Sequence, residues 1–574
     1  MMMPAPETMT IAYFSMEIGL DAAMSTYSGG LGILAGDTLK TAADLGLPMI
    51  GVTLVHRRGY FRQHLDAAGN QTETDSPWQP EQFLTPLSPH VVVKLADRDV
   101  HVQAWRYLIR GESGHTVPVY FLDTSLADNN PYDRTLTDHL YGGDDRYRLC
   151  QEAVLGLGGI ALLRALGYQN VRAYHMNEGH SALAILALLE EQAWGRSLSS
   201  VSESDKDAVR QRCVFTTHTP LPVGHDGFPL DLVRAVLGSE RADFLVAADC
   251  CPAGRLDMTY LALTFARYIN GVSMRHEEVS RGIFSNYSIE SVTNGVHAFT
   301  WTAPPFRRLF DHYIPEWRRD NLYLRYAISI PLGDIRQAHS EARAALFSEI
   351  EQRTGIRLRP GAVTLGLARR ATAYKRTDLL FTDLDRLRRI RRQVGPIQVI
   401  CGGKAHPRDE AGKALIRRVH QASAALGEDI PVVYLEEYDM AVASHLCPGV
   451  DVWLNTPQKP MEASGTSGMK AALNGVPSLS VLDGWWIEGH IEGVTGWAVG
   501  DGWRNESSPV DDAASLYDKL EYMVLPMFYE RPDAFAAIMR SAIALNGSYF
   551  NTQRMLMQYQ QNAYQAAGSP AAPK

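Results

Sequence analysis

The stretch VDVWLNTPQKPMEASGTSGMKAAL, residues 450–473, joins an apolar run, a loop and a helical pattern. Residues 450–454 form an apolar run of strand length, and residues 469–473 begin a helical pattern. The loop between them contains two glycines, Gly465 and Gly468, among other small residues. A strand, a loop and a helix in this order predict one unit of an α/β fold.

The same unit recurs on both sides of this stretch. Further apolar runs of strand length lie at residues 363–367, 397–401, 432–435 and 477–482. Helical patterns lie at residues 375–392, 410–426, 441–446 and 468–473, and residues 513–563 are mostly helical in pattern. Continuous apolar strands that alternate with helices predict a parallel sheet covered on both faces.

The N-terminal half of the chain alternates in a similar way. Apolar runs predict strands at residues 11–14, 49–55, 117–122 and 213–216, and amphipathic patterns predict helices at residues 34–45, 147–166 and 180–191. Gly69-Asn70 indicates the turn of a hairpin. The stretch VTNGVHAFTWTAPP, residues 292–305, contains Asn-Gly and Pro-Pro and favours a domain boundary.

We therefore predict an α/β protein with two doubly wound, Rossmann-like domains that face a central cleft. The expected domains are residues 1–299 and residues 300–574, with the terminal helices packing back on the N-terminal domain. Ligands of such sheets bind beyond the carboxyl ends of the strands.

The composition is that of an ordinary globular protein, with 574 residues of which 45% are hydrophobic and 21% are charged. A net charge of −9 argues against a dominant nucleic-acid surface. The six cysteines include no CxxC pair, which favours free thiols in a reducing compartment.

The sequence predicts neither a membrane protein nor a metal protein. It has no signal-peptide pattern and no apolar run long enough to span a membrane, so we expect a cytoplasmic protein. His218, His225 and Asp226 match no reliable metal-ligand spacing, and no metal site is expected.

The loop before Lys470 is suited to a phosphate group. Small residues ahead of a helix leave backbone N–H groups free at the positive end of the helix dipole. A lysine amine that is kept neutral by burial can form a Schiff base with an aldehyde. A phosphate cradle with such a lysine describes pyridoxal phosphate. A surface lysine after a Gly/Ser loop is the plainer alternative, and Ala471 excludes a Walker A loop, which needs Ser or Thr there.

A second phosphate-binding segment follows the predicted strand at residues 363–367. The string RRATAYKR, residues 369–376, places four cations in eight residues at the end of a strand. Arginine forks and lysine point charges bind phosphate oxygens. The alternative is a solvated basic patch.

The string EASGTSGMKAALNG, residues 462–475, closely resembles the cofactor-lysine motif of the α-glucan phosphorylases, which act on glycogen, starch and maltodextrin. That family usually has Gly-Asn where this chain has Ser467 and Gly468. By this resemblance, Lys470 binds pyridoxal 5′-phosphate covalently, and Gly465, Thr466 and Ser467 face the cofactor phosphate.

The resemblance runs through most of the chain and implies the fold and the reaction. The expected fold is the GT-B type of glycosyltransferases. The expected activity is the reversible phosphorolysis of terminal α-1,4-linked glucose to α-D-glucose 1-phosphate, with retention of configuration. The expected partners are an α-1,4-glucan and inorganic phosphate, without nucleic acid or membrane. The family forms dimers, so a homodimer remains open.

The cationic segment RRATAYKR resembles the family pattern KRIHEYKR. By that match, Arg370 and Lys375 hold the substrate phosphate, and Arg369 contacts the cofactor phosphate. Thr372 stands where the family usually has a histidine.

Five further residues receive roles from the resemblance. Gly30, in SGGLG, would face the cofactor phosphate and the sugar, and Tyr438, in YLEEY, would contact the cofactor phosphate. His218 in FTTHTPLP, Asn294 in VTNG and Glu462 would contact the sugar. Each residue also has a structural explanation. Gly30 can form a strand-to-helix turn, and Tyr438 can be an aromatic cap over the sheet. His218 can be a packed histidine, Asn294 can belong to an Asn-Gly turn, and Glu462 can be a helix N-terminal carboxylate. The glycines of SGGLG also resemble a dinucleotide-binding loop, but such a loop follows a strand and no strand is predicted directly before SGGLG.

Other polar and aromatic residues have two open interpretations. In HMNEGHSALA, residues 175–184, Asn177, Glu178 and His180 line the cleft, or Asn177 caps a helix. Three tryptophans stack on sugar rings or pack in the core: Trp301, Trp485 and Trp486.

Three other functions were weighed. A nucleotide-sugar-dependent glucan synthase shares the fold but carries Glu-x7-Glu, and the residue eight after Glu462 is Lys470. A non-catalytic glucan-binding protein would not need the cation cluster at residues 369–376, because carbohydrate binding alone requires no cations. A pyridoxal-phosphate enzyme of amino-acid metabolism needs an Asp at the pyridinium nitrogen, and none is identified.

Overall fold

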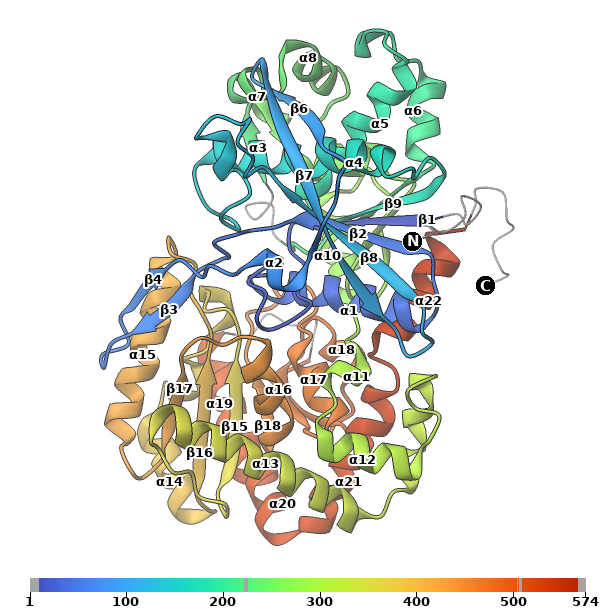
Figure 1. Cartoon of the computed structure of the whole chain (residues 1–574). Coiled ribbons are helices and arrows are strands. Elements are labelled where there is room, and N and C mark those ends of the chain that lie inside the picture. The colour runs from blue at the N-terminus through green and yellow to red at the C-terminus, as the bar shows by residue number, and fades with distance from the viewer. Residues whose placement is uncertain (1–9, 221–225, 503, 505–507, 566–574) are drawn as a thin grey trace.

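The computed structural model describes residues 10–220, 226–502, 504 and 508–565. The chain forms two lobes, each built around a sheet that is covered by helices (Figure 1). The sheet of the upper lobe contains strands between residues 10 and 291, and that of the lower lobe contains strands between residues 363 and 499. His225, considered above as a metal ligand, lies outside the described residues.

The sheet of the lower lobe has six parallel strands in the order β17-β16-β15-β18-β19-β20. Their bounds are Val363–Ala368 (β15), Ile397–Gly402 (β16), Val432–Leu435 (β17), Val452–Asn455 (β18), Ser478–Val481 (β19) and Gly496–Val499 (β20). The strand order reverses between β15 and β18, and such a switch point leaves a crevice at the carboxyl ends of the strands. The segments that follow β15 and β18 are therefore placed to share one site.

The sheet of the upper lobe has ten strands, of which seven are parallel in the order β14-β13-β10-β9-β1-β2-β8. Their bounds are Thr10–Phe14 (β1), Met49–Leu54 (β2), Thr116–Asp123 (β8), Val171–Asn177 (β9), Cys213–Thr216 (β10), Tyr268–Gly271 (β13) and Glu290–Ser291 (β14). The order again reverses beside β1, which places the loops after β1 and β9 at another switch point.

An antiparallel extension of this sheet was not predicted from the sequence. β7 (Arg98–Arg110) pairs antiparallel with β8, and both β5 (Thr85–Pro86) and β6 (Val91–Leu95) pair antiparallel with β7. In the first half of β7, buried and partly exposed residues alternate. This alternation is the available signal for a strand with one solvent-facing side.

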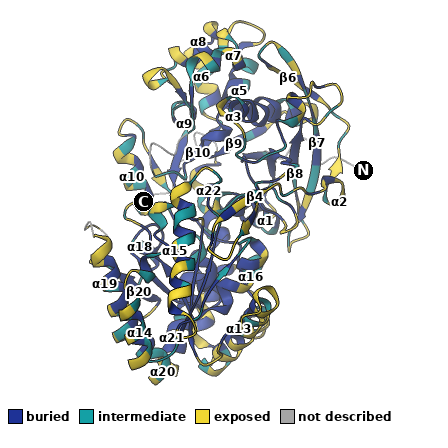
Figure 2. Cartoon of the chain, turned by 90° about the vertical axis from the view of Figure 1, so that its left-hand side faces the viewer, coloured by how far each residue is buried: buried dark blue, intermediate teal, exposed yellow. Residues whose placement is uncertain are grey.

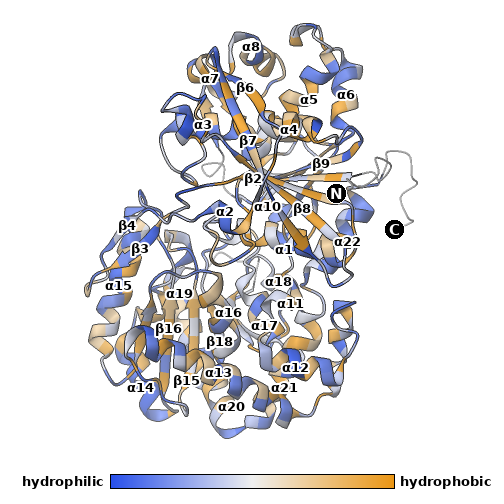
Figure 3. Cartoon of the chain, viewed as in Figure 1, coloured by the Kyte–Doolittle hydropathy of each residue, from blue (hydrophilic) through white to orange (hydrophobic). Residues whose placement is uncertain are grey.

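Most predicted helices are present. They include α1 (Gly30–Asp44), α5 (Ala184–Ala193), α15 (Glu410–Leu426), α16 (Met440–Gly449) and α17 (Ser467–Leu473). The helix expected at residues 147–166 is present as α3 (Asp145–Ala153) and α4 (Gly159–Ala165), which are joined by a π-helical segment at Val154–Gly158. Hydrophobic strands lie inside a shell of helices whose outer faces are hydrophilic (Figure 3).

The helix predicted at residues 375–392 is wrong in its first half, because α14 begins only at Leu384 (Leu384–Gln393). Arg376 adopts a left-handed conformation with φ of 45°, which ends the short turn Ala373–Lys375. Its guanidinium donates to the carbonyls of Thr456 and Pro457 and pairs with Asp512 at 2.7 Å. These contacts with residues distant in sequence outweigh the local helical preference.

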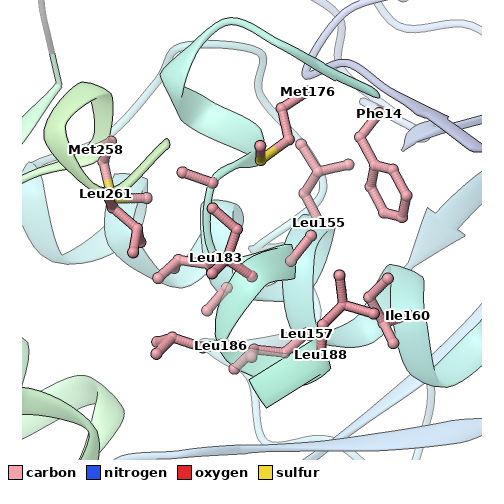
Figure 4. Close-up of a cluster of buried hydrophobic side chains, with 14 of the residues drawn as sticks. Phe14, Leu155, Leu157, Ile160, Met176, Leu183, Leu186, Leu188, Met258 and Leu261 are labelled. Atoms are coloured by element: carbon pink, nitrogen blue, oxygen red, sulfur yellow. The ribbon is translucent and has the colours of Figure 1, made fainter. Parts of the chain in front are cut away.

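Both faces of the parallel part of the upper sheet are largely buried (Figure 2). One face packs against α3, α4 and α5 through a cluster that includes Phe14, Leu155, Met176 and Leu183 (Figure 4). The other face packs against α1 and the C-terminal helix α22 (Thr552–Asn562), which contributes Met555, Leu556 and Tyr559. The last helix therefore lies on the upper lobe, although the helices before it cover the lower sheet.

The predicted hairpin consists of β3 (Arg62–Leu65) and β4 (Gln71–Thr74). It reaches from the upper lobe to the lower lobe. The Gln63 side-chain amide donates to the Gly403 carbonyl at 2.9 Å, and that of Gln71 donates to the Ala405 carbonyl at 2.9 Å. Buried hydrogen bonds of this kind hold the two lobes in register at one edge of the space between them.

Three possible features are absent from the described part of the chain. None of its helices combines the length and the apolar content that a membrane span needs. The same residues contain no cluster of side chains suited to a metal ion. All six cysteines are free thiols, five of them buried.

Candidate active site

A cavity of about 270 Å³ lies between the lobes, at the carboxyl ends of β15 and β18. Both lobes line it. All twelve residues singled out from the sequence are among the lining residues: Gly30, His218, Asn294, Arg369, Arg370, Lys375, Tyr438, Glu462, Gly465, Thr466, Ser467 and Lys470. The structure thus brings together six separate segments of the chain.

Two arginines directly follow β15 and have unused hydrogen-bond donors. Arg369 is only 8% exposed; one of its terminal nitrogens donates to the Leu454 carbonyl at 3.1 Å, and the other, Nη1, is buried without a partner. Burial lowers the pKa of Arg369 to about 10, so the group is still charged at neutral pH. Arg370 is exposed to the cavity and has no hydrogen bond or ion pair to any described residue. A buried, partly unsatisfied cation beside a free one favours an anionic ligand.

Lys375 and Glu462 form an ion pair across the cavity wall. Both side chains are largely buried, and the Lys375 amine also lies 4.8 Å from the centre of the Tyr374 ring. Arg376 has a left-handed backbone, and its guanidinium is anchored on the Thr456 carbonyl. This arrangement fixes the direction in which the Lys375 side chain leaves the turn. A ligand that brings its own negative charge can compete with Glu462 for this lysine.

Lys470 lies in α17 with its amine turned toward the cavity. The amine is 3.5 Å from the centre of the Trp301 ring, and no described residue makes a hydrogen bond or an ion pair with it. Burial lowers the pKa of the Lys470 amine, with smaller opposing effects from neighbouring groups. A lysine with a depressed pKa and a free amine is the type that reacts with carbonyl compounds.

The loop before α17 is held in an extended path around the cavity. Gly465 has φ of +84°, a conformation that suits glycine. The Glu462 backbone N–H donates to Asp483 at 2.9 Å, and the Ser467 hydroxyl accepts from the Trp453 indole at 3.1 Å. The buried Ser464 hydroxyl has no partner among the described residues. The loop thus has fixed ends and one polar group without a partner.

The upper lobe contributes the start of α1. A Cβ atom added at Gly30 would meet nothing within 4 Å, so this turn borders open space. The turn is held by Glu17, which accepts from the Ser28 and Gly29 backbone N–H groups at 2.5 and 3.3 Å. Sequence analysis missed Glu17, because nothing in its local sequence indicates that it lies under a turn eleven residues away.

His218 is oriented by Asn177 from the neighbouring strand β9. The Asn177 amide donates to the Ser15 hydroxyl at 3.1 Å, which turns its oxygen toward His218 Nε2 at 2.6 Å. The Nε2 atom therefore carries the proton. Burial, followed by the nearby histidines, lowers the pKa of His218 well below its ordinary value, so the ring is neutral. Its Nδ1 atom remains as a hydrogen-bond acceptor.

Asn177, Glu178 and His180 do not line the cavity themselves. Glu178 accepts from the His218 backbone N–H at 2.8 Å and from the Thr219 hydroxyl at 2.9 Å. The side chain that caps the short turn after β9 is that of Glu178, not Asn177. Asn177 and Glu178 therefore support His218 from behind.

Asn294 is held through its backbone. Its carbonyl accepts from Arg554 at 2.9 Å, and its N–H donates to the Val272 carbonyl at 3.1 Å. The side-chain oxygen is buried and has no partner in the described residues. A fixed amide with an unused acceptor at a cavity wall can receive a hydrogen bond from a ligand hydroxyl.

The aromatic residues differ in their positions. Tyr438 lines the cavity and is partly buried, and Trp301 lies beneath the Lys470 amine. Trp485 and Trp486 are 1% and 0% exposed and belong to the core of the lower lobe. Of the two interpretations for those two tryptophans, core packing is the correct one.

The cavity therefore combines cations that have no charged partner among the described residues, an acidic residue, neutral polar groups and a buried amine with a lowered pKa. The unpaired groups, Arg369, Arg370 and Lys470, lie on the lower lobe, whereas His218 and Asn294 lie on the upper lobe. Such a site can bind one or two phosphate groups on one side and a polyhydroxylated molecule on the other.

Residues 240–494 match the family model described as carbohydrate phosphorylase. The chain is 37% identical to the maltodextrin phosphorylase of Thermococcus litoralis, over 97% of this chain and 70% of that protein. It is 36% identical to the glycogen phosphorylase of Mycobacterium tuberculosis, over 97% of this chain and 71% of that protein. It is 35% identical to the glycogen phosphorylase of Aquifex aeolicus, over 96% and 85%, respectively.

Proposed function

Because the chain belongs to the carbohydrate phosphorylase family, we propose that it is an α-glucan phosphorylase, a glycosyltransferase that acts on glycogen or maltodextrin. It transfers terminal α-1,4-linked glucose to inorganic phosphate and forms α-D-glucose 1-phosphate reversibly. The observation that carries this proposal is the set of unpaired cations beside the Lys470 amine in one cavity. Nothing favours a nucleotide-sugar-dependent synthase.

The fold is proposed to be the GT-B type, with domains at residues 1–299 and 300–574. The support is that both sheets reverse their strand order at a switch point and that the cavity lies between them. A site between two such domains can close on a substrate by a small relative rotation. We also propose a cytoplasmic location, on the basis of the sequence.

The proposed cofactor is pyridoxal 5′-phosphate, bound covalently to Lys470. The cavity fits this group because a buried amine with a lowered pKa would face it and because the buried Arg369 nitrogen has no partner among the described residues and suits an anion. Arg369, Tyr438 and the turn at Gly30 would surround the cofactor, with the backbone of Gly465, Thr466 and Ser467. When bound, the cofactor supplies a phosphate group that can exchange a proton with the substrate phosphate near neutral pH.

The protein residues would bind and orient the reactants. Arg370 and Lys375 would hold the inorganic phosphate, which donates its proton to the departing glycosidic oxygen and then bonds to the glucose C1 on the same face. When the phosphate pairs with Lys375, the ion pair between Lys375 and Glu462 breaks. The Glu462 carboxylate would then be free to accept hydrogen bonds from sugar hydroxyls. The unpaired Asn294 oxygen and His218 Nδ1 would accept from other hydroxyls of the same sugar. Clustered cations stabilise two neighbouring phosphate groups that would otherwise repel each other.

The test combines a spectrum, covalent trapping and an activity assay. Borohydride reduction followed by peptide mapping should place a pyridoxyl group on Lys470. The variant Lys470→Ala should lose both the visible absorption band and the release of glucose 1-phosphate from maltodextrin with phosphate. The control Lys519→Ala changes a surface lysine that pairs with Glu492 and should keep both. A pyridoxyl group on another lysine, or phosphorolysis by the Lys470 variant, would contradict the proposal.

A further inference from the structure

A buried carboxylate lies behind the cavity wall, next to the reactive lysine. Asp37 is in α1, one turn beyond the cavity-lining residues Ile33 and Leu34, and its side chain is fully buried. One carboxylate oxygen, Oδ2, accepts from the Trp301 indole N–H at 2.8 Å and from the His297 backbone N–H at 3.1 Å. The other, Oδ1, is buried without a hydrogen-bond partner among the described residues.

The indole connects this carboxylate to Lys470. Trp301 ends the short helix α11 (Ala298–Trp301), and the Lys470 amine rests 3.5 Å from the centre of its ring. A ring held at its N–H edge cannot rotate away from the amine. The face of an indole also attracts an ammonium group. The position of the Lys470 amine therefore depends on the hydrogen bond from Trp301 to Asp37.

The titratable groups that act on Lys470 lie on two helices, α1 and α16. Asp37 and Lys40 lie in α1 and act in opposite senses: Asp37 favours the protonated amine, and Lys40 disfavours it. Cys447, in α16, also favours the protonated amine. Burial, the largest effect, disfavours it, and the pKa of the Lys470 amine is lowered as a result. Burial also lowers the pKa of Lys40.

A buried carboxylate with an unpaired oxygen is unfavourable unless cations compensate its charge. Asp37 has Lys40 three residues further along α1 and Lys470 beyond the indole. The carboxylate and these two amines form one electrostatic unit. A neutral acceptor such as an amide oxygen could bind the Trp301 and His297 N–H groups equally well, so the retained charge points to a role at the amine.

We propose that Asp37 is a positioning residue for Lys470, which fixes the indole face that the amine rests on and supplies the negative charge that balances this amine. This inference rests on the proposed function, in which Lys470 is the cofactor lysine. An amine reacts with an aldehyde only after it has lost its proton. Asp37 would therefore reduce the reactivity of the Lys470 amine by favouring its protonated form, whereas Lys40 would increase that reactivity by disfavouring this form.

The variant Asp37→Asn isolates the charge. The amide oxygen can replace Oδ2 and accept from both Trp301 and His297, so only the negative charge is lost. We expect the Lys470 amine of this variant to react faster, by about tenfold for each unit by which its pKa falls. The opposing control is Lys40→Gln, which removes a repelling cation and should slow the reaction.

The measurement is the pH dependence of Lys470 acetylation by acetic anhydride, read by mass spectrometry of peptides and normalised to exposed lysines. It uses the full-length chain after hydroxylamine treatment, which releases any aldehyde from the amine. Faster labelling in Asp37→Asn and slower labelling in Lys40→Gln support the proposal. Unchanged labelling, or shifts in the same direction in both variants, overturn it. Because the assay contains neither glucan nor phosphate, its outcome is independent of whether phosphorolysis occurs.

A second measurement separates position from charge. The Trp301 contribution to the near-ultraviolet circular dichroism is obtained by subtracting the spectrum of Trp301→Phe. This contribution should be lost in Asp37→Leu, which has no acceptor, and should be retained in Asp37→Asn. If the signal is the same in all three Asp37 forms, the indole is held by other contacts and the positioning role is excluded.

Discussion

Arg369 and Arg370 follow the same strand, but their surroundings differ. Arg369 is buried and donates one hydrogen bond to the Leu454 carbonyl, whereas Arg370 is exposed to the cavity and has no partner among the described residues. An exposed cation without a partner can move to meet a diffusing anion at little cost. A buried one is better suited to an anion that stays bound. This difference agrees with the proposed roles at the substrate phosphate and the cofactor phosphate.

The first prediction concerns Arg370. Replacing it by glutamine should raise the KM for phosphate at least tenfold, because a charge-assisted hydrogen bond contributes about 1.5–3 kcal/mol. The cofactor content, measured from the visible absorption band, should be unchanged. The control is Arg357→Gln, which alters an exposed arginine paired with Glu351. A variant with the native KM for phosphate would refute the proposed role.

The second prediction concerns Asn177, which touches His218 but not the cavity. Asn177→Ala should lower kcat roughly tenfold to a hundredfold, because the released ring can turn away from the sugar. Ser15→Ala, which removes the partner of the Asn177 amide together with the hydroxyl's bond to the Glu17 carbonyl, should have a smaller effect in the same direction. If Asn177→Ala lowers the melting temperature without changing kcat, its role is purely structural.

All twelve site residues named from the sequence lie around one cavity, but their supporting residues were mostly missed. The twelve belong to short motifs whose residue types are chemically informative. Glu17, Asp37 and Asp483 have no such motif. Each becomes relevant only because folding places it behind a turn, an indole or a loop. Supporting groups of this kind are defined by contacts between distant segments, which the local sequence does not encode.

At the level of elements, α22 is the last helix of the chain but serves a loop of the upper lobe. Arg554 donates to the carbonyls of Thr293 and Asn294 at 2.6 and 2.9 Å. The helix thus fixes the backbone at Asn294 from the side opposite to the cavity. The sequence predicted a helical tail, but it did not identify this contact.

The third prediction follows from that contact. Arg554→Gln should reduce kcat/KM for the glucan by about tenfold, or about 1.4 kcal/mol, because the Asn294 amide loses its fixed position. Binding of the cofactor should not change. Met557→Ala, on the exposed face of the same helix, provides the control and should have native kinetics. If both substitutions reduce kcat/KM equally, the loss is due to a general disturbance of the helix and not to the contact of Arg554 with Asn294.

The strands that were predicted lie close to observed strands, because their runs are mainly apolar and are bounded by turn residues. The run at residues 432–435 coincides with β17, and that at residues 213–216 coincides with β10. The start of the helix predicted at residue 375 was wrong, because Arg376 is anchored by groups that lie far along the chain. Local pattern is reliable where burial is uniform, and it fails where tertiary hydrogen bonds dictate the backbone.

For the molecule as a whole, buried histidines couple stability to pH. His175 accepts from the Tyr564 hydroxyl at Nδ1 and donates to the Thr216 hydroxyl from Nε2, so its neutral form is fully satisfied. Burial lowers the pKa of His175 to about 3 and that of His56 to about 4. Their ordinary value is 6.5. Between these values the unfolded chain binds protons that the folded chain does not bind.

The fourth prediction is therefore a loss of stability in mild acid. The free energy of unfolding should fall as pH decreases below about 6.5, by up to about 1.4 kcal/mol per pH unit for each such histidine. His175→Asn should flatten this slope, although it lowers stability at neutral pH. Denaturant titrations at several pH values provide the measurement, and an unchanged slope in the His175 variant would contradict this account.

Two kinds of information determine this protein. The order of strands, loops and helices and the chemistry of the loop at residues 462–470 can be read directly from the chain, because burial imposes a local pattern and because phosphate and aldehyde chemistry require particular residue types. The unpaired Nη1 atom of Arg369 and the ion pair of Lys375 with Glu462 arise only when the loops of the lower lobe fold together. The link from Asp37 through Trp301 to Lys470 requires in addition that the upper lobe packs on the lower one. Their energies depend on distance and burial, and both quantities are set by residues that lie far apart in the sequence.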